Sequence, residues 1–277
     1  MSNSHTLASV WGERVRQHHA QSEAARDQMG KAKEEDFWKP IANKFRADPR
    51  RTDDSLVNRL LREVQPDSTV LDVGGGAGRL ALPLALKCEH VTVAEPSDSM
   101  LEQLRIAAGE ANIRNVKAHA ASWENARVDP ADFVLCAHVL YGVEDIETFV
   151  RKLDAHAKKS VLIVMFLDAP QSHHSHFWKA VHGEERITLP ALKELMPILW
   201  ELGFYPDLEM LERMSAPVYD DLDEALHDLR FRLYVAPSSD KDKRLRQAID
   251  ELLVSTDGGL TFKDATSRQL ALASWRK

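Results

Sequence analysis

A cluster of glycines between two apolar runs constrains this chain more than any other feature. It lies in the stretch VLDVGGGAGRLALPLA, residues 70–85. The first run is short and contains β-branched residues, which favours a buried strand, and the second is rich in leucine and alanine, which favours a helix. Glycines adopt backbone conformations that other residues avoid, and they let another molecule approach the main chain closely. The stretch therefore predicts a strand, a turn that holds a ligand, and a helix.

Strands and helices alternate on both sides of this turn. Apolar runs typical of strands lie at 68–74, 90–96, 116–122, 131–140, 160–167 and 206–214, and runs with helical spacing lie at 97–111, 143–157 and 189–203. Such alternation predicts a parallel sheet that is covered by helices on both faces. The nearly continuous apolar run at 161–167 fits a strand that is buried on both sides.

The two ends of the chain depart from this alternation. Residues 1–54 are polar and prone to form helices, which predicts a helical cap, and the core is expected at 55–215. Leucines spaced four, three and four apart from Leu222 to Leu233, and a similar set after Leu245, predict a pair of helices. This pair would form an insert at 216–254, and a last strand at 255–277 would complete the core sheet.

Composition limits the class of protein. The net charge of −7 gives no general basic surface for nucleic acid, and Cys88 and Cys136 form no Cys-x-x-Cys motif. No stretch reaches the roughly 20 apolar residues that a membrane-spanning helix needs, and the first residues lack the apolar core of a signal peptide. We therefore expect a cytoplasmic protein that does not enter a membrane.

Two phosphate-binding motifs fit the glycine cluster poorly. A loop of the ATPase kind needs lysine and a hydroxyl residue after its last glycine, whereas here Gly78 is followed by Arg79 and Leu80. A dinucleotide motif that starts at Gly74 would place Arg79 where a third glycine is needed, and one that starts at Gly76 would set the turn two residues late. The dinucleotide reading, and with it an oxidoreductase that uses NAD, remains as an alternative.

The pattern Asp72-x-Gly74-x-Gly76-x-Gly78 resembles that of class I S-adenosylmethionine-dependent methyltransferases. The resemblance implies S-adenosylmethionine as cofactor and a Rossmann-like, doubly wound α/β fold with a seven-stranded, mostly parallel sheet. This cofactor has no phosphate, so it needs neither the lysine nor the hydroxyl. Its carboxylate suits the free N–H groups at the start of a helix, and its ammonium group needs an acceptor such as Asp72 or a backbone carbonyl.

Further residues extend the resemblance along the chain. Glu95 ends the second strand, where a carboxylate can accept both ribose hydroxyls. It opens EPSDSML, which resembles the family pattern E-P-S-x-x-M and implies that Met100 packs near the adenine, although a capped helix with a core methionine gives the same pattern. The cofactor-binding residues expected in this way are Asp72, Gly74, Gly75, Gly76, Gly78, Glu95, Pro96, Ser97, Met100, Ser122, Trp123, Ala137 and His138.

The contacts after the third and fourth strands are expected by analogy with the family. Trp123 would stack against the adenine, and Ser122 or Glu124 would bond it, although a tryptophan is also a common core residue. Backbone at Ala137 or His138 would bond the ammonium group.

Catalytic residues are harder to predict. Methyl transfer from a sulfonium is an in-line displacement that depends mainly on alignment, so a methyltransferase needs no catalytic signature. His138, Tyr141 and His182 are candidates because they follow strands where an acceptor could lie, and for His138 a structural role is an equal alternative. The histidines near residue 175 match no metal-binding spacing, so no metal is expected.

The sequence as a whole predicts an enzyme that methylates a small molecule. The family motif Asn-Pro-Pro-Tyr/Phe, typical of enzymes that methylate amide or base amino groups, is missing after the fourth strand, which reads CAHVLYG. The alternatives are an RNA- or protein-modifying methyltransferase and a non-catalytic S-adenosylmethionine-binding protein. The sequence does not indicate an oligomeric state.

Overall fold

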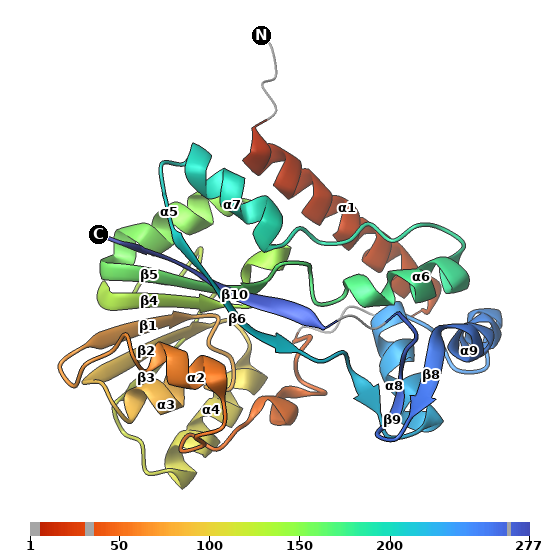
Figure 1. Cartoon of the computed structure of the whole chain (residues 1–277), viewed down its shortest axis with the longest axis horizontal. Helices are drawn as coiled ribbons and strands as arrows, with labels where there is room; N and C mark the ends of the chain where they lie inside the picture. The colour runs from red at the N-terminus through yellow and green to blue at the C-terminus, as the bar shows by residue number, and fades with distance from the viewer. Residues whose placement is uncertain (1–5, 31–35, 265–266) are drawn as a thin grey trace. The chain divides into compact units, whose positions relative to one another are not determined.

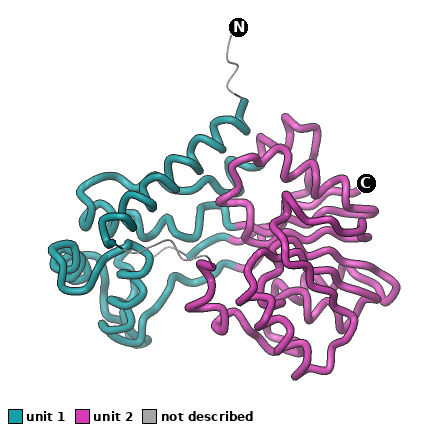
Figure 2. Tube along the Cα trace, turned by 180° about the vertical axis from the view of Figure 1, so that it is seen from behind, with its two compact units in different colours: residues 1–33, 166–195, 213–269 teal, residues 34–165, 196–212, 270–277 magenta. Residues whose placement is uncertain are grey.

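The computed structural model describes residues 6–30, 36–264 and 267–277. These residues belong to two compact units, which are coloured separately in Figure 2. The first unit comprises residues 1–33, 166–195 and 213–269, and the second comprises residues 34–165, 196–212 and 270–277. Each unit is described here by itself.

Among the described residues, the second unit is built on a seven-stranded sheet with strand order β3-β2-β1-β4-β5-β10-β6 (Figure 1). Its strands are β1 (Thr69–Val73), β2 (His90–Glu95), β3 (Val116–Ala120), β4 (Ala131–Ala137), β5 (Ala157–Phe166), β6 (Asp207–Met214) and β10 (Arg268–Arg276). The first five strands in chain order pair in parallel, with Val73 opposite both Ala94 and Cys136. Parallel strands with helical connections were predicted from the alternation of apolar runs, and this part of the fold is confirmed.

The last strand runs against β5. The N–H of Leu167 donates to the carbonyl of Gln269, and the N–H of Lys277 donates to the carbonyl of Lys159. Residue numbers rise along one strand as they fall along the other, so β10 is antiparallel to β5. It also lies next to β6, and the doubly wound, mostly parallel seven-stranded sheet is thereby confirmed.

Helices connect the strands of this unit. They are α2 (Ser55–Leu60), α3 (Ala81–Ala85), α4 (Asp98–Glu110), α5 (Ile146–His156) and α7 (Leu192–Glu201), together with short 3₁₀ turns at Ala42–Phe45 and Leu140–Gly142. The side chains of Asp54 and Ser97 each accept a backbone N–H in the first turn of the helix that follows. The second apolar run of the glycine stretch forms the helix α3, which begins at Ala81 and ends at Ala85.

The core of the second unit lies along the central strands. Leu135 and Cys136 on β4 and Ile163 and Val164 on β5 have no solvent-exposed surface. Neighbouring residues of a strand point to opposite faces of a sheet, so both faces of β4 and β5 are covered. This explains why these strands are apolar at nearly every position.

The first unit is mainly helical. Its helices are α1 (Leu7–Gln28), α6 (Ser175–His182), α8 (Leu222–Leu233) and α9 (Asp240–Leu252), and a 3₁₀ turn at Ser172–His174 precedes α6. The predicted pair of helices is thus present as α8 and α9. Their buried leucines, among them Leu226, Leu229 and Leu245, pack in one core with Phe177 and Trp178 of α6.

A small sheet, which the sequence did not predict, accompanies these helices. It consists of β7 (Val218–Tyr219), β8 (Leu253–Thr256) and β9 (Gly259–Phe262) in the order β7-β9-β8. The strands are antiparallel and very short, so they offer little periodicity to detect. Gly259 has φ +122°, and a Cβ there would lie 2.2 Å from the carbonyl oxygen of Tyr219, so the register of this sheet depends on glycine.

A half-buried arginine fixes α1 within the first unit. The Arg186 guanidinium donates to Nε2 of His18 at 2.8 Å and to Oγ of Ser22 at 2.6 Å, and it lies 3.9 Å from the ring of Trp178. Nδ1 of His18 donates to the carbonyl of Ile187 at 2.6 Å. Burial, followed by the charge of Arg186, lowers the pKa of His18 to about 4. The ring is therefore neutral at pH 7 and serves as both donor and acceptor.

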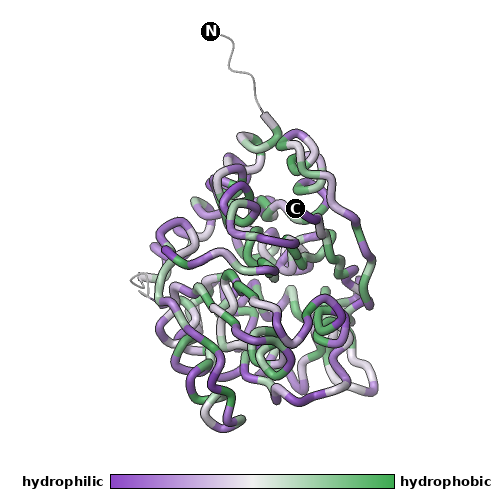
Figure 3. The backbone as a smooth tube through the Cα atoms, turned by 90° about the vertical axis from the view of Figure 1, so that its left-hand side faces the viewer, coloured by the Kyte–Doolittle hydropathy of each residue, from purple (hydrophilic) through white to green (hydrophobic). Residues whose placement is uncertain are grey.

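Hydrophobic and hydrophilic positions are interspersed along the trace (Figure 3). Within the described residues, no helix has the length and apolar character that crossing a bilayer requires.

Candidate functional site

The glycine turn after β1 adopts a backbone that only glycine takes up without strain. Gly74, Gly76 and Gly78 have φ values of +72°, +54° and +82°. Space also excludes side chains, because a Cβ on Gly74 would lie 2.3 Å from Cγ2 of Val139, and one on Gly78 would lie 2.3 Å from Cδ1 of Leu104. The turn therefore packs directly against the segment after β4 and against α4.

Gly75 and Gly76 face different surroundings. A Cβ on Gly75 would lie 2.7 Å from Oδ2 of Asp72, whereas one on Gly76 would meet only Sδ of Met100, at 3.8 Å. Met100 is buried together with Ala77 of the turn and Ala42 of the 3₁₀ turn at 42–45. The structure thus brings the turn, the start of α4 and the segment around residue 42 together.

The carboxylate of Asp72 is buried, and one of its two oxygens makes no hydrogen bond to a described residue. Its side chain lies on β1 with 1% of the residue exposed, and Oδ2 has no hydrogen-bond partner among the described residues. Burial, and then the charge of Glu95, raises the pKa of Asp72 to about 7. A buried carboxylate oxygen without a partner is costly, so such an atom is a candidate for binding a ligand that carries a positive charge or a donor.

Glu95 lies at the end of β2 with both carboxylate oxygens engaged. Oε2 accepts the N–H of Gly76 at 3.1 Å, and Oε1 accepts the N–H of Ser97 at 2.9 Å. Burial raises the pKa of Glu95, although the two N–H donors oppose the shift. The carboxylate is thus held in one orientation beside the glycine turn, and each oxygen keeps capacity for a further donor.

Asp36 is a residue that the sequence did not single out. Its carboxylate accepts hydrogen bonds from Oγ of Ser97 at 2.9 Å and from the N–H of Ser99 at 3.1 Å, and it also accepts the N–H of Trp38 at 3.0 Å. Through these contacts it fastens the segment that carries Trp38 to the start of α4, next to Glu95.

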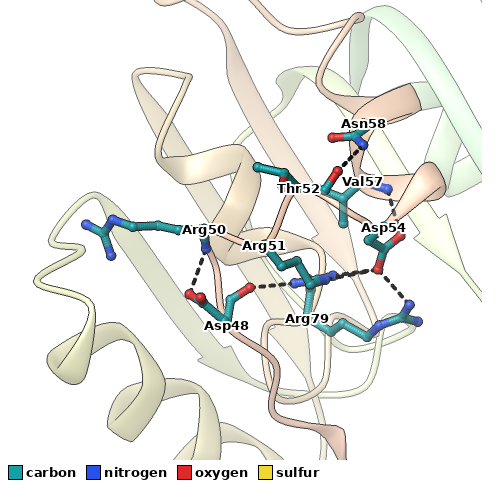
Figure 4. Close-up of polar contacts among 8 residues, drawn as sticks. All are labelled: Asp48, Arg50, Arg51, Thr52, Asp54, Val57, Asn58 and Arg79. Atoms are coloured by element: carbon teal, nitrogen blue, oxygen red, sulfur yellow. Dashed lines mark hydrogen bonds and ion pairs between the residues drawn. The ribbon is translucent and has the colours of Figure 1, made fainter.

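A second anchor holds the other end of the glycine turn (Figure 4). Oδ2 of Asp54 accepts hydrogen bonds from Arg51 at 2.9 Å and from Arg79 at 2.8 Å, while Oδ1 accepts the N–H of Val57 at 3.0 Å. Arg79 directly follows the last glycine, where a phosphate-binding loop has its lysine. Its pairing with Asp54 gives it a structural role.

The segment after β4 contributes His138 and its neighbours. The N–H of His138 donates to the carbonyl of Val164 at 2.9 Å, and the residue has φ +62°, which is unusual for a non-glycine residue. Its ring lies 6.5 Å from that of Tyr141 at an angle of 14°. Ala137 ends β4 and is partly exposed, whereas Tyr141 is buried. Strain of this kind is often kept where function needs it.

The residues after β3 are arranged differently. Trp123 is buried, its Nε1 donates to the carbonyl of Phe149 at 3.4 Å, and the Lys152 ammonium lies 4.6 Å from its ring centre. The indole therefore packs on α5. Ser122 is partly exposed, and its Oγ accepts a hydrogen bond from Asn125 at 3.1 Å. An adenine contact for Ser122 and Trp123 remains a prediction.

His182 lies in the first unit, whereas the other predicted site residues lie in the second. Its Nε2 donates to the carbonyl of Leu233 at 2.8 Å, Nδ1 accepts from the Lys241 ammonium at 3.0 Å, and its ring is stacked on Trp178. Burial lowers the pKa of His182 to about 4. These contacts join α6 to α8 and α9. Among the described residues, no three His, Cys, Asp or Glu side chains are grouped so as to hold a metal ion.

Comparison with known proteins finds one matching family model and one related sequence. A family model described as a methyltransferase domain matches residues 45–209. An uncharacterized protein of Haemophilus influenzae (strain Rd) is 31% identical over 170 residues, which cover 57% of this chain and 60% of that protein. The match thus spans less than two thirds of the length of this relative.

Solved structures share the fold. The YcgJ protein of Bacillus subtilis superposes with a TM-score of 0.56 at 16% identity, covering 80% of this chain and 98% of that one. Magnesium protoporphyrin IX methyltransferase of Synechocystis PCC 6803, determined with bound S-adenosylhomocysteine, gives a TM-score of 0.51 at 15% identity, covering 95% of this chain and 98% of that one.

Proposed function

This chain belongs to the methyltransferase domain family, and from that premise we propose that it is an S-adenosylmethionine-dependent methyltransferase whose acceptor is a small molecule. The observation that carries the proposal is the pair of carboxylates at the ends of β1 and β2. Asp72 has one oxygen without a partner among the described residues, and Glu95 is oriented by two backbone N–H groups beside the turn.

The residues at the turn fit this cofactor. The oxygen of Asp72 suits the ammonium group of the amino acid part, and Glu95 suits the two ribose hydroxyls. A dinucleotide or nucleoside triphosphate would bring phosphates to the turn. Arg79, the cation that follows the last glycine, is already paired with Asp54. The carboxylates of Asp72 and Glu95 at the turn repel phosphate. The chemistry of these side chains therefore favours a nucleoside without phosphate.

When bound, S-adenosylmethionine supplies a methyl group on a positively charged sulfur, and the carbon–sulfur bond breaks as the acceptor's bond to the methyl forms. The contribution of the protein is to bind and to orient. Gly74, Gly75 and Gly76 keep side chains out of the turn, and Asp72 and Glu95 fix the two ends of the nucleoside amino acid. Asp36 holds the segment around Trp38 to the start of α4. None of these roles requires the protein to move a proton.

Two facts support a small molecule as acceptor. The net charge is −7, which opposes binding to the phosphates of RNA. Magnesium protoporphyrin IX methyltransferase of Synechocystis, which shares the fold, acts on a small molecule by its name.

The experiment that tests the proposal follows a labelled methyl group. The protein would be incubated with S-adenosylmethionine labelled in the methyl group, together with separated small-molecule, RNA and protein fractions of a cell extract. Protein-dependent label in the small-molecule fraction supports the proposal, and the Glu95→Ala variant should lose it. Label in the RNA or protein fraction would favour a macromolecular acceptor. Cofactor binding without transfer to any fraction would favour a non-catalytic binding protein.

A further inference from the structure

The strand β6 forms one edge of the large sheet and is exposed along its length. It is the last strand in the order of the sheet, so among the described residues only β10 pairs with it. Seven of its eight residues are exposed, and Leu211 is partly buried. An edge strand presents a row of main-chain N–H and C=O groups that can pair with another strand, and proteins usually prevent this with short strands, lysine or proline. β6 is longer than the usual ~5–6 residues and has neither lysine nor proline.

The other edge of the sheet is protected in the usual way. β3 has five residues, includes Lys117, and has no large apolar side chain among its exposed residues, all five of which are described. On β6, by contrast, Leu208, Met210 and Met214 are 40%, 53% and 40% exposed, and their even spacing places them on one face of the sheet. Tyr205, two residues before the strand, is also exposed. Apolar side chains gathered at an exposed place commonly mark an interaction site.

The charges of β6 have both signs. The strand reads DLEMLERM, so its acids are Asp207, Glu209 and Glu212, and its single cation is Arg213. The exposed guanidinium of Arg213 donates to Oγ of Ser267 at 3.3 Å and forms no ion pair with a described residue. Opposite charges that face each other across two strands stabilise the pair, and like charges destabilise it. A partner strand that fits β6 therefore offers an acid opposite Arg213.

A second copy of β6 meets this requirement. Two identical antiparallel strands related by a two-fold axis place one residue opposite itself, and residues equally distant from it then lie opposite each other. An axis at Leu211 sets Glu209 opposite Arg213 and Leu208 opposite Met214, and each of these pairs occurs twice. The same register thus joins opposite charges and covers exposed apolar side chains.

Other registers of the same two strands fit less well. An axis at Glu209 or at Glu212 sets a carboxylate opposite its own copy. An axis at Met210 sets Asp207 opposite Arg213, but within the strand its one apolar pair is Met210 with its own copy. The sequence of β6 therefore favours the register centred on Leu211.

We propose that β6 pairs with β6 of a second copy of this chain in the register centred on Leu211, so that the protein forms a two-fold symmetric dimer with a continuous sheet. Within one copy, Nε of Arg59 donates to Oε2 of Glu209 at 2.7 Å, so Oε1 can accept from Arg213 of the second copy. Main-chain hydrogen bonds between the two edges add to these side-chain contacts.

Reversal of charges tests both the dimer and its register. The full chain would be studied by sedimentation velocity over a series of concentrations. Arg213→Glu sets two carboxylates opposite each other, and Glu209→Arg sets two guanidinium groups opposite each other. Each variant alone should therefore dimerise at least about tenfold more weakly than the parent. An equimolar mixture of the two should restore the dimer, because opposite charges again face each other at both positions.

Asp207→Arg is the matched control, since it makes the same charge change on the same face of the strand. In the register centred on Leu211 it lies opposite Ser215, so alone it should dimerise as the parent does, and it should not restore the dimer when mixed with Arg213→Glu. Restoration by Glu209→Arg would also show that both single variants fold.

Four results would overturn the proposal. They are a parent that stays monomeric at every concentration, a dimer that the charge reversals leave unchanged, a mixture of Arg213→Glu and Glu209→Arg that stays monomeric, and restoration by Asp207→Arg. The last result would indicate the register centred on Met210.

Discussion

The backbone N–H of Gly76 donates to Oε2 of Glu95 at 3.1 Å, and this hydrogen bond joins the turn after β1 to the end of β2. The second oxygen of Glu95 is held by the N–H of Ser97 at 2.9 Å. Both donors belong to the main chain, so the carboxylate is oriented before a ligand arrives. Binding to it therefore costs little ordering of the side chain.

In the proposed site, the two oxygens of Glu95 are the acceptors for the ribose hydroxyls, and replacing Glu95 removes both. We expect Glu95→Ala to weaken binding of S-adenosylhomocysteine about 100-fold, because two hydrogen bonds to a charged group are lost. Calorimetric titration measures this change. Glu89→Ala, an exposed acid just before β2, is the matched control and should bind as the parent does. Equal affinities for the parent and Glu95→Ala would remove Glu95 from the site.

The glycine turn gives a prediction about stability. Gly74→Ala should reduce the free energy of unfolding by about 2–3 kcal/mol, since its Cβ would meet Val139 at 2.3 Å and its φ is +72°. Urea unfolding measures the change. Gly109→Ala is the control, because no atom lies within 4 Å of its added Cβ and the residue is inside α4. There alanine should stabilise by about 0.5–1 kcal/mol. If Gly74→Ala leaves the free energy of unfolding unchanged, the backbone of the turn is not restricted as described.

Asp72 makes the stability of the ligand-free protein depend on pH. Its pKa is raised to about 7 from an ordinary value of 3.8, so between these values the folded protein binds more protons than the unfolded chain. The stabilising contribution of the protonated acid is complete below about pH 4 and is lost as the pH rises through 7. Asp72→Asn should remove this dependence and should be more stable than the parent at pH 8 by about 1–3 kcal/mol.

The same acid predicts how the affinity for the ligand varies with pH. An ammonium group favours the ionised form of Asp72, so the parent should bind S-adenosylhomocysteine more tightly as the pH rises through 7. The Asn variant should bind more weakly and without this dependence. Titrations at pH 6 and pH 8 compare the two proteins. A parent whose affinity is the same at both values would place the ammonium group away from Asp72.

His18 predicts the opposite pH dependence of stability, which should fall as the pH falls. Its pKa in the folded protein is about 4, below its ordinary value of 6.5, so the unfolded chain binds the extra proton as the pH falls between these values. The parent should therefore lose stability from pH 6.5 down to pH 4. Glutamine can donate to the Ile187 carbonyl and accept from Arg186 without titrating, so His18→Gln should lose less stability over this range. His19→Gln, the adjacent histidine, is the control.

The sequence allowed the sheet and much of the site to be predicted because both follow from local patterns. Apolar runs and glycines reveal where strands end, and parallel strands bring those ends to one edge, so Asp72 and Glu95 could be assigned to one site. The structure confirms the predicted fold, and the family model confirms the family. The role of each predicted binding residue remains a proposal.

Other features could not be predicted because they depend on contacts between distant segments. Asp36 accepts a hydrogen bond from Ser97, which is 61 residues away in the chain, and no sequence pattern links the two residues. The strand β7 has two residues, too few to show a period. Trp123 was expected near the adenine because of its place after β3, and only the structure reveals its hydrogen bond to Phe149 on α5.

The most direct test of the central claim compares two ligands by calorimetry. S-adenosylhomocysteine and NAD would each be titrated into the parent protein under the same conditions. A glycine turn flanked by Asp72 and Glu95 should bind S-adenosylhomocysteine at one site per chain and should give no heat with NAD. Binding of NAD, or no binding of S-adenosylhomocysteine, would contradict the claim that this turn holds a nucleoside without phosphate.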